Sequence, residues 1–307
     1  MDHVVVLRAL KLGDFLVAVP ALRGIRRAWP RHELMLATSG WLEPLVRLAG
    51  CADTVLPTHG LAPLPDRARR PAVAVNMHGA GPQSSTLLDL LAPQRRVGHA
   101  GPGWPGPRWI AALPERERWC RMVRAHGVPA DAGDLLLPHP ERTSPAPGAI
   151  VVHPGAAYGS KRWPANRFAE VAGGLRRDGH RVVITGSAAE APLAAEVASR
   201  AELPDRDVLA GRTGLLDLAA LVAHARLVIS GDTGTAHLAY AFRTPSVTLF
   251  GPAPADTWGP PAGGPHVTLS ADHARRGEPF ADDPDPALLG VSAADVHDQA
   301  RDLLGRN

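Results

Sequence analysis

Residues 227–239 read LVISGDTGTAHLA: an apolar run of strand length stops at Gly-Asp-Thr-Gly-Thr and resumes as an apolar, helix-like segment with His237 in its first turn. A buried strand whose Gly-rich end opens a helix leaves backbone N–H groups and the positive helix end facing outward, where a phosphate binds. The same kind of turn also occurs for purely steric reasons. The stretch therefore predicts a strand–turn–helix unit that holds a phosphorylated ligand.

This unit is repeated along the chain of 307 residues. Strand-like runs are followed by segments with helical periodicity in both halves. The strands are predicted at 4–7, 33–37, 72–76, 149–152, 181–185, 207–209, 227–230 and 247–250, and the helices at 15–29, 41–48, 84–91, 168–177, 188–201, 216–223 and from 236. Alternating strands and helices predict an α/β fold with parallel sheets covered by helices on both faces.

A proline-rich segment, LPHPERTSPAPG at 137–148, separates the two series and is typical of a linker. We predict two doubly wound domains, residues 1–143 and 144–307. A final amphipathic helix is expected at 291–304, within the second domain or packed back on the first. Such domains place a binding crevice at the carboxyl ends of both sheets, between the halves.

Composition narrows the class of partner and compartment. Lys and Arg total 33 against 30 Asp and Glu, and the charges are interspersed, which argues against nucleic acid and suits small anions. Cys51 and Cys120 lack disulfide or zinc spacing, which favours the cytoplasm. Charged residues interrupt the apolar stretch 4–22, so neither a signal peptide nor a membrane span is predicted. We expect a soluble protein with at most peripheral membrane contact.

Three residues after strand ends of the second half are candidates for phosphate and sugar binding. Lys161 can place a point charge on a diphosphate, although P-loop spacing is absent, or it is a solvated surface lysine. Asp232 can accept hydrogen bonds from sugar hydroxyls or cap the following helix. His237 can donate to a phosphate or to a core carbonyl.

Further polar residues follow other strands. Glu190 can bind a ribose diol or complement a helix dipole, and the turn at 211–214 can let a base lie against backbone. In the first half, Asp14 can act as a general base or cap a helix. The acceptor-side candidates, suited to a glycan, a lipid-linked sugar or a small metabolite, are Lys11, Asn76, His78 and Gln83.

Several literal motif matches are set aside. The GxGxxG match at 101–106 contains two prolines and follows no strand, so it is a loop. The DxD matches at 205–207 and 283–285 follow no strand in the expected crevice, so neither a metal nor another cofactor is predicted. The GxSxG and HExxH motifs are absent, which argues against a serine hydrolase or a zincin.

Five blocks of sequence share a pattern with a known family: LKLGDFLVAVPAL at 10–22, NMHGAGPQS at 76–84, HPGAAYGSKRWPANRF at 153–168, VVITGSAAE at 182–190 and the long block at 209–252. Taken together, these blocks resemble the heptosyltransferase family, glycosyltransferase family nine, whose best-known members transfer heptose from ADP-heptose to lipopolysaccharide core. The resemblance implies a GT-B fold of two Rossmann-like domains, with the acceptor bound by the first and the nucleotide-sugar by the second.

The resemblance also implies roles for individual residues. Asp14 matches the catalytic base, Asp232 the aspartate that holds the donor sugar, and Glu190 the acid that binds ribose. Thr213 lies where backbone meets the adenine. The donor diphosphate is assigned to Lys161 and to the backbone amides of Thr233, Gly234 and Thr235, with His237 just behind them.

Two departures from the family leave the acceptor and the donor sugar open. Ala156 and Ala157 stand where many relatives have hydroxyl residues, and GEPFADDPDPALL at 277–289 replaces a Cys-rich segment. We predict inverting, metal-independent transfer from a nucleotide-sugar, with ADP, UDP and GDP not distinguished by the residues. The alternatives are a nucleotide-sugar epimerase of the same fold and a non-catalytic nucleotide-sugar-binding protein.

Overall fold

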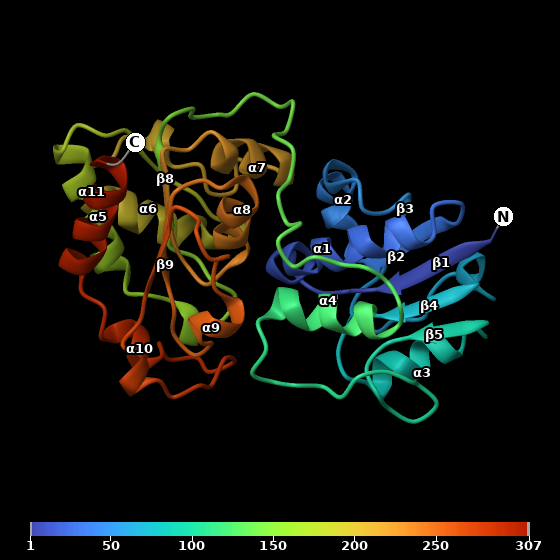
Figure 1. Ribbon diagram of the computed structural model, residues 1–307. Coiled ribbons are helices and arrows are strands. Elements are labelled where there is room, and N and C mark those ends of the chain that lie inside the picture. The colour runs from blue at the N-terminus through green and yellow to red at the C-terminus, as the bar shows by residue number, and fades with distance from the viewer. Residues whose placement is uncertain (1, 306–307) are drawn as a thin grey trace. The chain divides into compact units, whose positions relative to one another are not determined.

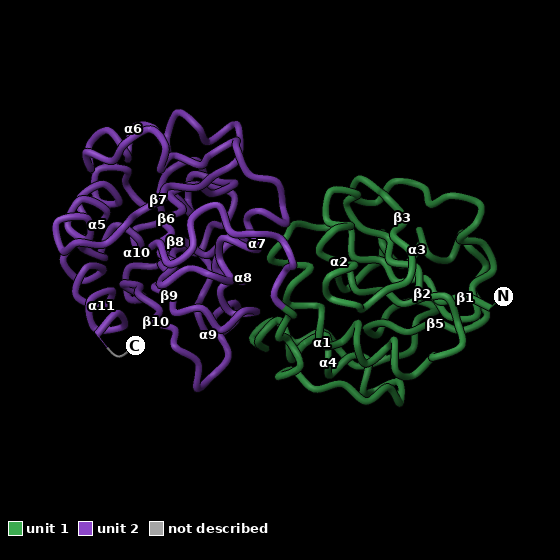
Figure 2. The backbone as a smooth tube through the Cα atoms, turned by 90° about the horizontal axis from the view of Figure 1, so that it is seen from above, with its two compact units in different colours: residues 1–138 green, residues 139–307 purple. Residues whose placement is uncertain are grey.

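The computed structural model describes residues 2–305 and separates into two compact units, Met1–Pro138 (unit 1) and His139–Asn307 (unit 2), shown in Figure 2. Each unit contains one five-stranded sheet in which every paired strand is parallel (Figure 1). The predicted α/β class with two doubly wound sheets is therefore confirmed. Among residues 2–305, no helix is long and apolar enough to cross a membrane.

Unit 1 has the strand order β3-β2-β1-β4-β5. Its strands are β1 (His3–Leu7), β2 (Glu33–Thr38), β3 (Thr54–Pro57), β4 (Val73–Asn76) and β5 (Arg95–Val97). Its helices are α1 (Leu12–Ala28), α2 (Glu43–Ala49), α3 (Gln83–Asp89) and α4 (Glu115–Ala125), with 3-10 turns at Gly40–Leu42 and Asp66–Ala68. Strands β3 and β5 and helix α4 were not predicted, because the strands are short and α4 reads ERERWCRMVRA, dominated by charge.

Both faces of the unit 1 sheet are covered, as the near-continuous apolar character of β1 requires. On one face, Val5 and Leu7 pack with Leu87 and Leu88 of α3. Helices α1 and α4 pack against each other. The strand ends are thereby held at fixed positions relative to the first turn of α1, which carries Asp14.

Unit 2 has the strand order β10-β9-β8-β6-β7. Its strands are β6 (Ile150–His153), β7 (Val182–Ile184), β8 (Leu227–Gly231), β9 (Ser246–Leu249) and β10 (His266–Leu269). Its helices are α5 (Ala165–Arg177), α6 (Ala191–Arg200), α7 (Leu215–Ala223), α8 (Gly234–Phe242), α9 (Ala255–Trp258), α10 (Pro286–Leu289) and α11 (Ala293–Gly305). Four 3-10 turns accompany them, at Gly159–Lys161, Ala188–Glu190, Asp205–Asp207 and Asp272–Ala274.

One expectation for unit 2 needs correction. The strand predicted at 207–209 is only an isolated bridge between Ile184 and Val208, because a 3-10 turn occupies 205–207. In α11, Val296 and Ala300 belong to the core that α5 and α6 form over the unit 2 sheet. Strand β10, which was not predicted, completes the edge of that sheet.

The two strand orders differ, and each has a point where successive connections leave in opposite directions. In unit 1 this point lies between β1 and β4, as in classic dinucleotide-binding sheets. In unit 2 it lies between β6 and β8, as in flavodoxin-like sheets. Ligands of open α/β sheets bind outside the carboxyl ends of the strands at such points. We call these positions switch points. Each unit therefore has one switch point where a site is expected, outside the carboxyl ends of the strands.

Candidate functional site

The switch point of unit 2 brings Lys161 and Asp232 together. Lys161 ends the 3-10 turn after β6, and Asp232 directly follows β8. The Lys161 Nζ atom donates to Asp232 Oδ2 at 2.7 Å, and His237 Nε2 lies 3.6 Å from Asp232 Oδ1. The Asp232 side chain is 6% exposed and that of Lys161 24%. Lys161 is thus a partly buried member of a charged cluster and not a solvated surface lysine.

The Asp232 carboxylate stays ionised in this setting. Burial by itself raises its pKa, but the Lys161 charge and the hydrogen bond with His237 outweigh burial and hold the pKa at about 2. His237 contacts this carboxylate, which is neither of the two partners expected for it, and its ring packs edge-on against Tyr240 and Trp258. An anionic ligand that binds Lys161 therefore competes with Asp232 for the same ammonium group.

Helix α8 presents unpaired polar groups beside this cluster. Thr233 is its N-cap in extended conformation, Gly234 is its first residue and Thr235 is buried. The first N–H groups of any α-helix lack acceptors within the helix. The hydroxyls of Ser230 and Thr233 are buried with no hydrogen-bond partner among the described residues. Buried orphan hydroxyls are rare in folded proteins, so this corner is suited to a polar ligand.

Glu190 lies at the neighbouring strand end and is already engaged. Its Oε2 accepts hydrogen bonds from Ser187 N at 2.7 Å and Ser187 Oγ at 2.8 Å, which closes a capping box. Burial raises the pKa of Glu190. The Ser187 N–H and the nearby His153 lower it by more than burial raises it, so the net shift is downward. A Cβ added to Gly155 would lie 2.2 Å from Glu190 Oε1. Glu190 therefore lies in the first turn, where a carboxylate complements the helix dipole, and in addition caps that turn through Oε2, which leaves Oε1 for a ligand.

His153 and the loop that carries Thr213 lie at the same carboxyl end of the unit 2 sheet. Burial is the main cause that lowers the His153 pKa, and its Nδ1 atom has no partner among the described residues. The backbone of Gly211 donates to Gly186 O at 3.0 Å, which fixes the 211–214 turn beside the end of β7. Thr213 is half-buried there. Of the two loop alanines, Ala156 is buried and its carbonyl accepts from Arg162 Nε at 3.0 Å, while Ala157 is exposed.

In unit 1, Asp14 sits in the first turn of α1 with its side chain 25% exposed. Its Oδ2 accepts from Lys11 N at 3.3 Å, so Asp14 caps α1 from the third helical position, while Lys11 and not Asp14 is the N-cap. Its Oδ1 lies 3.4 Å from Arg8 Nη2. No functional role was predicted for Arg8, which in the sequence is a charge that interrupts an apolar stretch. Its position directly after the buried strand β1 is the sequence feature that could have indicated one.

The four acceptor-side candidates separate by burial. Asn76 is 2% exposed and braces the turn after β4, donating to Ser84 Oγ at 2.9 Å and accepting from His78 N at 3.1 Å. Burial, followed by the charge of Arg8, lowers the His78 pKa, and its Nδ1 has no partner among residues 2–305. Lys11 and Gln83 are exposed. His78, Lys11 and Gln83 therefore remain contact candidates, whereas Asn76 has a structural task.

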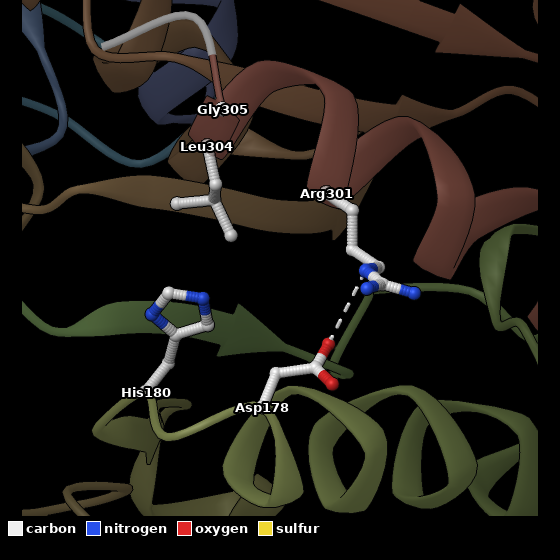
Figure 3. A pocket seen from close by; sticks show the side chains of 5 residues that line it. All are labelled: Asp178, His180, Arg301, Leu304 and Gly305. Carbon is white, nitrogen blue, oxygen red and sulfur yellow. Dashed lines mark ion pairs between the residues drawn. The ribbon is translucent and has the colours of Figure 1, made fainter.

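A cavity of about 320 Å³ in unit 2 lies elsewhere (Figure 3). Its walls include Asp178, His180 and Leu304, and Arg301 Nε lies 3.6 Å from Asp178 Oδ2. His180 precedes β7, so this cavity is at the amino end of that strand, opposite to the edge that carries the candidate residues. Within residues 2–305, no group of three or more His, Cys, Asp or Glu side chains is arranged to hold a metal ion.

Comparison with known proteins points in one direction. Residues 137–276 match the model of glycosyltransferase family 9 (heptosyltransferase). Lipooligosaccharide heptosyltransferase 2 of Haemophilus influenzae is 37% identical over 105 residues, which are 32% of this chain and 30% of that protein. The aligned segments of the first curated relatives thus span about a third of their length. The family match falls almost entirely on unit 2.

Solved structures extend the likeness to the whole fold. The E. coli ADP-heptose lps heptosyltransferase II superposes with a TM-score of 0.77 at 22% identity, covering 99% of both chains. The iron-containing dodecameric glycosyltransferase TibC of enterotoxigenic E. coli has a TM-score of 0.64 at 15% identity, covering 99% of this chain and 76% of its own. At these identities the likeness establishes the fold, and the predicted GT-B class is confirmed.

Proposed function

We propose that the chain, whose residues 137–276 match the model of glycosyltransferase family 9, transfers a sugar, with ADP-heptose as donor, to an acceptor hydroxyl. The observation that carries this proposal is the Lys161–Asp232 pair at the switch point of unit 2, beside the start of α8. This arrangement combines a cation, a carboxylate and free backbone donors at the edge where α/β sheets bind nucleotides. A diphosphate and a sugar need these three kinds of partner.

Donor binding rearranges the pair in this proposal. The diphosphate takes the Lys161 ammonium from Asp232, and the carboxylate then accepts hydrogen bonds from sugar hydroxyls. The backbone amides of Thr233, Gly234 and Thr235 and the orphan Thr233 hydroxyl donate to the phosphates. As the glycosidic bond breaks, negative charge develops on the leaving diphosphate, and preorganised donors stabilise it most at that moment.

Lysine usage supports a specific role for Lys161. Of the 33 cationic Lys and Arg residues, only Lys11 and Lys161 are lysine. Both follow the first strand of their sheet. A compact ammonium acts as a point charge and fits beside a carboxylate where a planar guanidinium needs more room. The chain is otherwise rich in arginine, so these two positions stand out because they carry an ammonium group and not a guanidinium group.

Asp14 is the proposed general base. The acceptor oxygen attacks the anomeric carbon, the bond from that carbon to the diphosphate oxygen breaks, and the acceptor proton moves to Asp14. A single displacement inverts the anomeric configuration. Lys161 and the α8 amides take the electrostatic role that a metal ion has in other transferases, so we propose transfer without a metal. Glu190 Oε1 and the backbone near Thr213 hold the nucleoside.

We further propose a glycan acceptor of the lipopolysaccharide type, which the names of the relatives suggest, bound on the side of Lys11, His78 and Gln83. The reaction is placed in the cytoplasm, with peripheral contact to the membrane that holds such an acceptor. No nucleic acid is involved.

Turnover and binding experiments test the proposal. Calorimetry with ADP, UDP and GDP should show the tightest binding for ADP, with affinity lost in Lys161→Ala and kept in Arg162→Ala. ADP release from ADP-heptose should require heptose-free lipopolysaccharide and persist after dialysis against EDTA. Conversion of the donor alone to a new nucleotide-sugar would instead establish an epimerase. Tight ADP binding without turnover on any acceptor of a broad panel would establish a non-catalytic binding protein.

The two lysines allow an independent check on the site. Acetylation by an N-hydroxysuccinimide ester, followed by mass spectrometry, should be slowed by ADP at Lys161 and not at Lys11. Equal slowing at both, or none at Lys161, would remove Lys161 from the donor site.

A further inference from the structure

Arg8 is an almost completely buried cation outside the set of residues assigned above. It directly follows β1 and is 2% exposed. Its Nη1 donates to Met77 O at 2.7 Å and its Nε donates to Asp14 O at 2.9 Å, while Nη2 lies 3.4 Å from Asp14 Oδ1. Its Cζ lies 4.5 Å above the ring of Trp119. One side chain thus links β1, α1, the turn after β4 and helix α4.

Burial of the charged guanidinium costs folding free energy, and packing contacts alone do not explain why this cost is accepted. Desolvation lowers the pKa of Arg8, which shows that the surroundings disfavour its charge, although Asp14 counteracts part of this. Buried ion pairs can often be replaced by apolar side chains of similar volume without loss of stability. Two of the three donated contacts go to Asp14. The guanidinium is therefore matched to that residue rather than to the core in general.

We infer that Arg8 is the positioning residue for Asp14, holding the carboxylate in the one orientation that receives the acceptor proton. This inference rests on the proposed function, in which Asp14 is the base. Arg8 donates hydrogen bonds to the backbone carbonyl and to Oδ1 of Asp14, and Lys11 N donates to Oδ2. The carboxylate is thus fixed at both oxygens while its side chain remains 25% exposed. Proton transfer needs hydrogen-bond reach, and a misplacement of about 1 Å costs about 10²-fold in rate.

A double-mutant cycle separates positioning from general stabilisation. Arg8→Met keeps the apolar stem over Trp119 and removes every donor. We expect it to lower kcat about 10²-fold, with the KM for ADP-heptose and the Kd for ADP unchanged. In the Asp14→Ala background it should lower kcat no further, because there is no carboxylate left to orient. Heptose-free lipopolysaccharide serves as acceptor and ADP release as the readout.

Arg118→Met is the matched control. Arg118 is also 2% exposed and stacks on a tryptophan, with its Cζ 4.1 Å from the Trp109 ring, but its ion pair is with Glu115. Its effect on kcat should multiply with that of Asp14→Ala. Multiplication of the Arg8→Met effect in the same way would overturn the inference and leave the function intact.

The crystal structure of Arg8→Met decides the question even without turnover. We expect the Asp14 carboxylate in more than one orientation, or turned away from its parent position. A single orientation that superposes on the parent overturns the inference. Activity of Asp14→Ala equal to that of the parent would instead refute the proposed base.

Discussion

Removing the cation of the Lys161–Asp232 pair tests the electrostatics of the candidate site. Lys161→Met keeps the length of the side chain and leaves the Asp232 carboxylate buried with only His237 beside it. The pKa of Asp232 is lowered from 3.8 to about 2. At 1.36 kcal/mol per pKa unit this net shift corresponds to about 2 kcal/mol, a balance in which burial opposes the lowering by Lys161 and His237. We expect a loss of about 2 kcal/mol or more in the free energy of unfolding, because Lys161→Met removes the main favourable contribution and leaves the burial cost.

The pH dependence has a definite sign. The folded-state pKa of Asp232 is below 3.8, so the stabilisation is complete above that pH and is lost as the pH falls toward about 2. Urea unfolding should therefore give a constant difference between the parent and Lys161→Met from pH 8 to pH 5, and a shrinking one below pH 4. The double variant Lys161→Met/Asp232→Asn should recover most of the stability and still fail to bind ADP.

Two results would refute this reasoning. A loss below about 0.5 kcal/mol at neutral pH would mean that the pair behaves like an exposed ion pair. A difference that does not change below pH 4 would mean that the lost stability does not come from Asp232. Arg162→Met, which removes a neighbouring cation that contacts the Ala156 carbonyl, is the control and should leave the pH profile of the parent unchanged.

Three further predictions concern the nucleoside edge and the base. Asp14→Ala should lower kcat by about 10²–10⁴-fold and leave the Kd for ADP unaltered, as stopped-flow turnover and calorimetry can show. Glu190→Gln should weaken ADP binding about 10-fold, with calorimetry as the measure, because a neutral amide accepts more weakly from the ribose hydroxyls. Gly155→Ala should weaken ADP binding at least as much, because its Cβ would displace Glu190 Oε1, 2.2 Å away; unchanged affinity there would mean that Glu190 does not meet the nucleoside.

Much of the architecture could be predicted because its signals are local. Parallel strands buried on both faces read as continuous apolar runs, as in β1 and β8, and Gly-containing turns mark where they end. The elements that escaped, β5 and α4, carry little apolar signal of their own. Their place is decided by pairing with β4 and packing against α1. The order of strands could not be predicted, because it depends on contacts between distant segments.

By itself the sequence determined which residues stand at strand ends: Asp14, Glu190 and Asp232 in their turns, with Lys161 nearby. It left each with two interpretations, since a carboxylate after a turn can cap a helix or bind a ligand. The tertiary structure showed that Asp14 and Glu190 cap their helices, and it brought Lys161 to Asp232 across 71 residues. It also buried Arg8 against Asp14. Such pairings arise only when the sheet aligns the carboxyl ends of neighbouring strands, because electrostatic partners are chosen by distance in space and not along the chain.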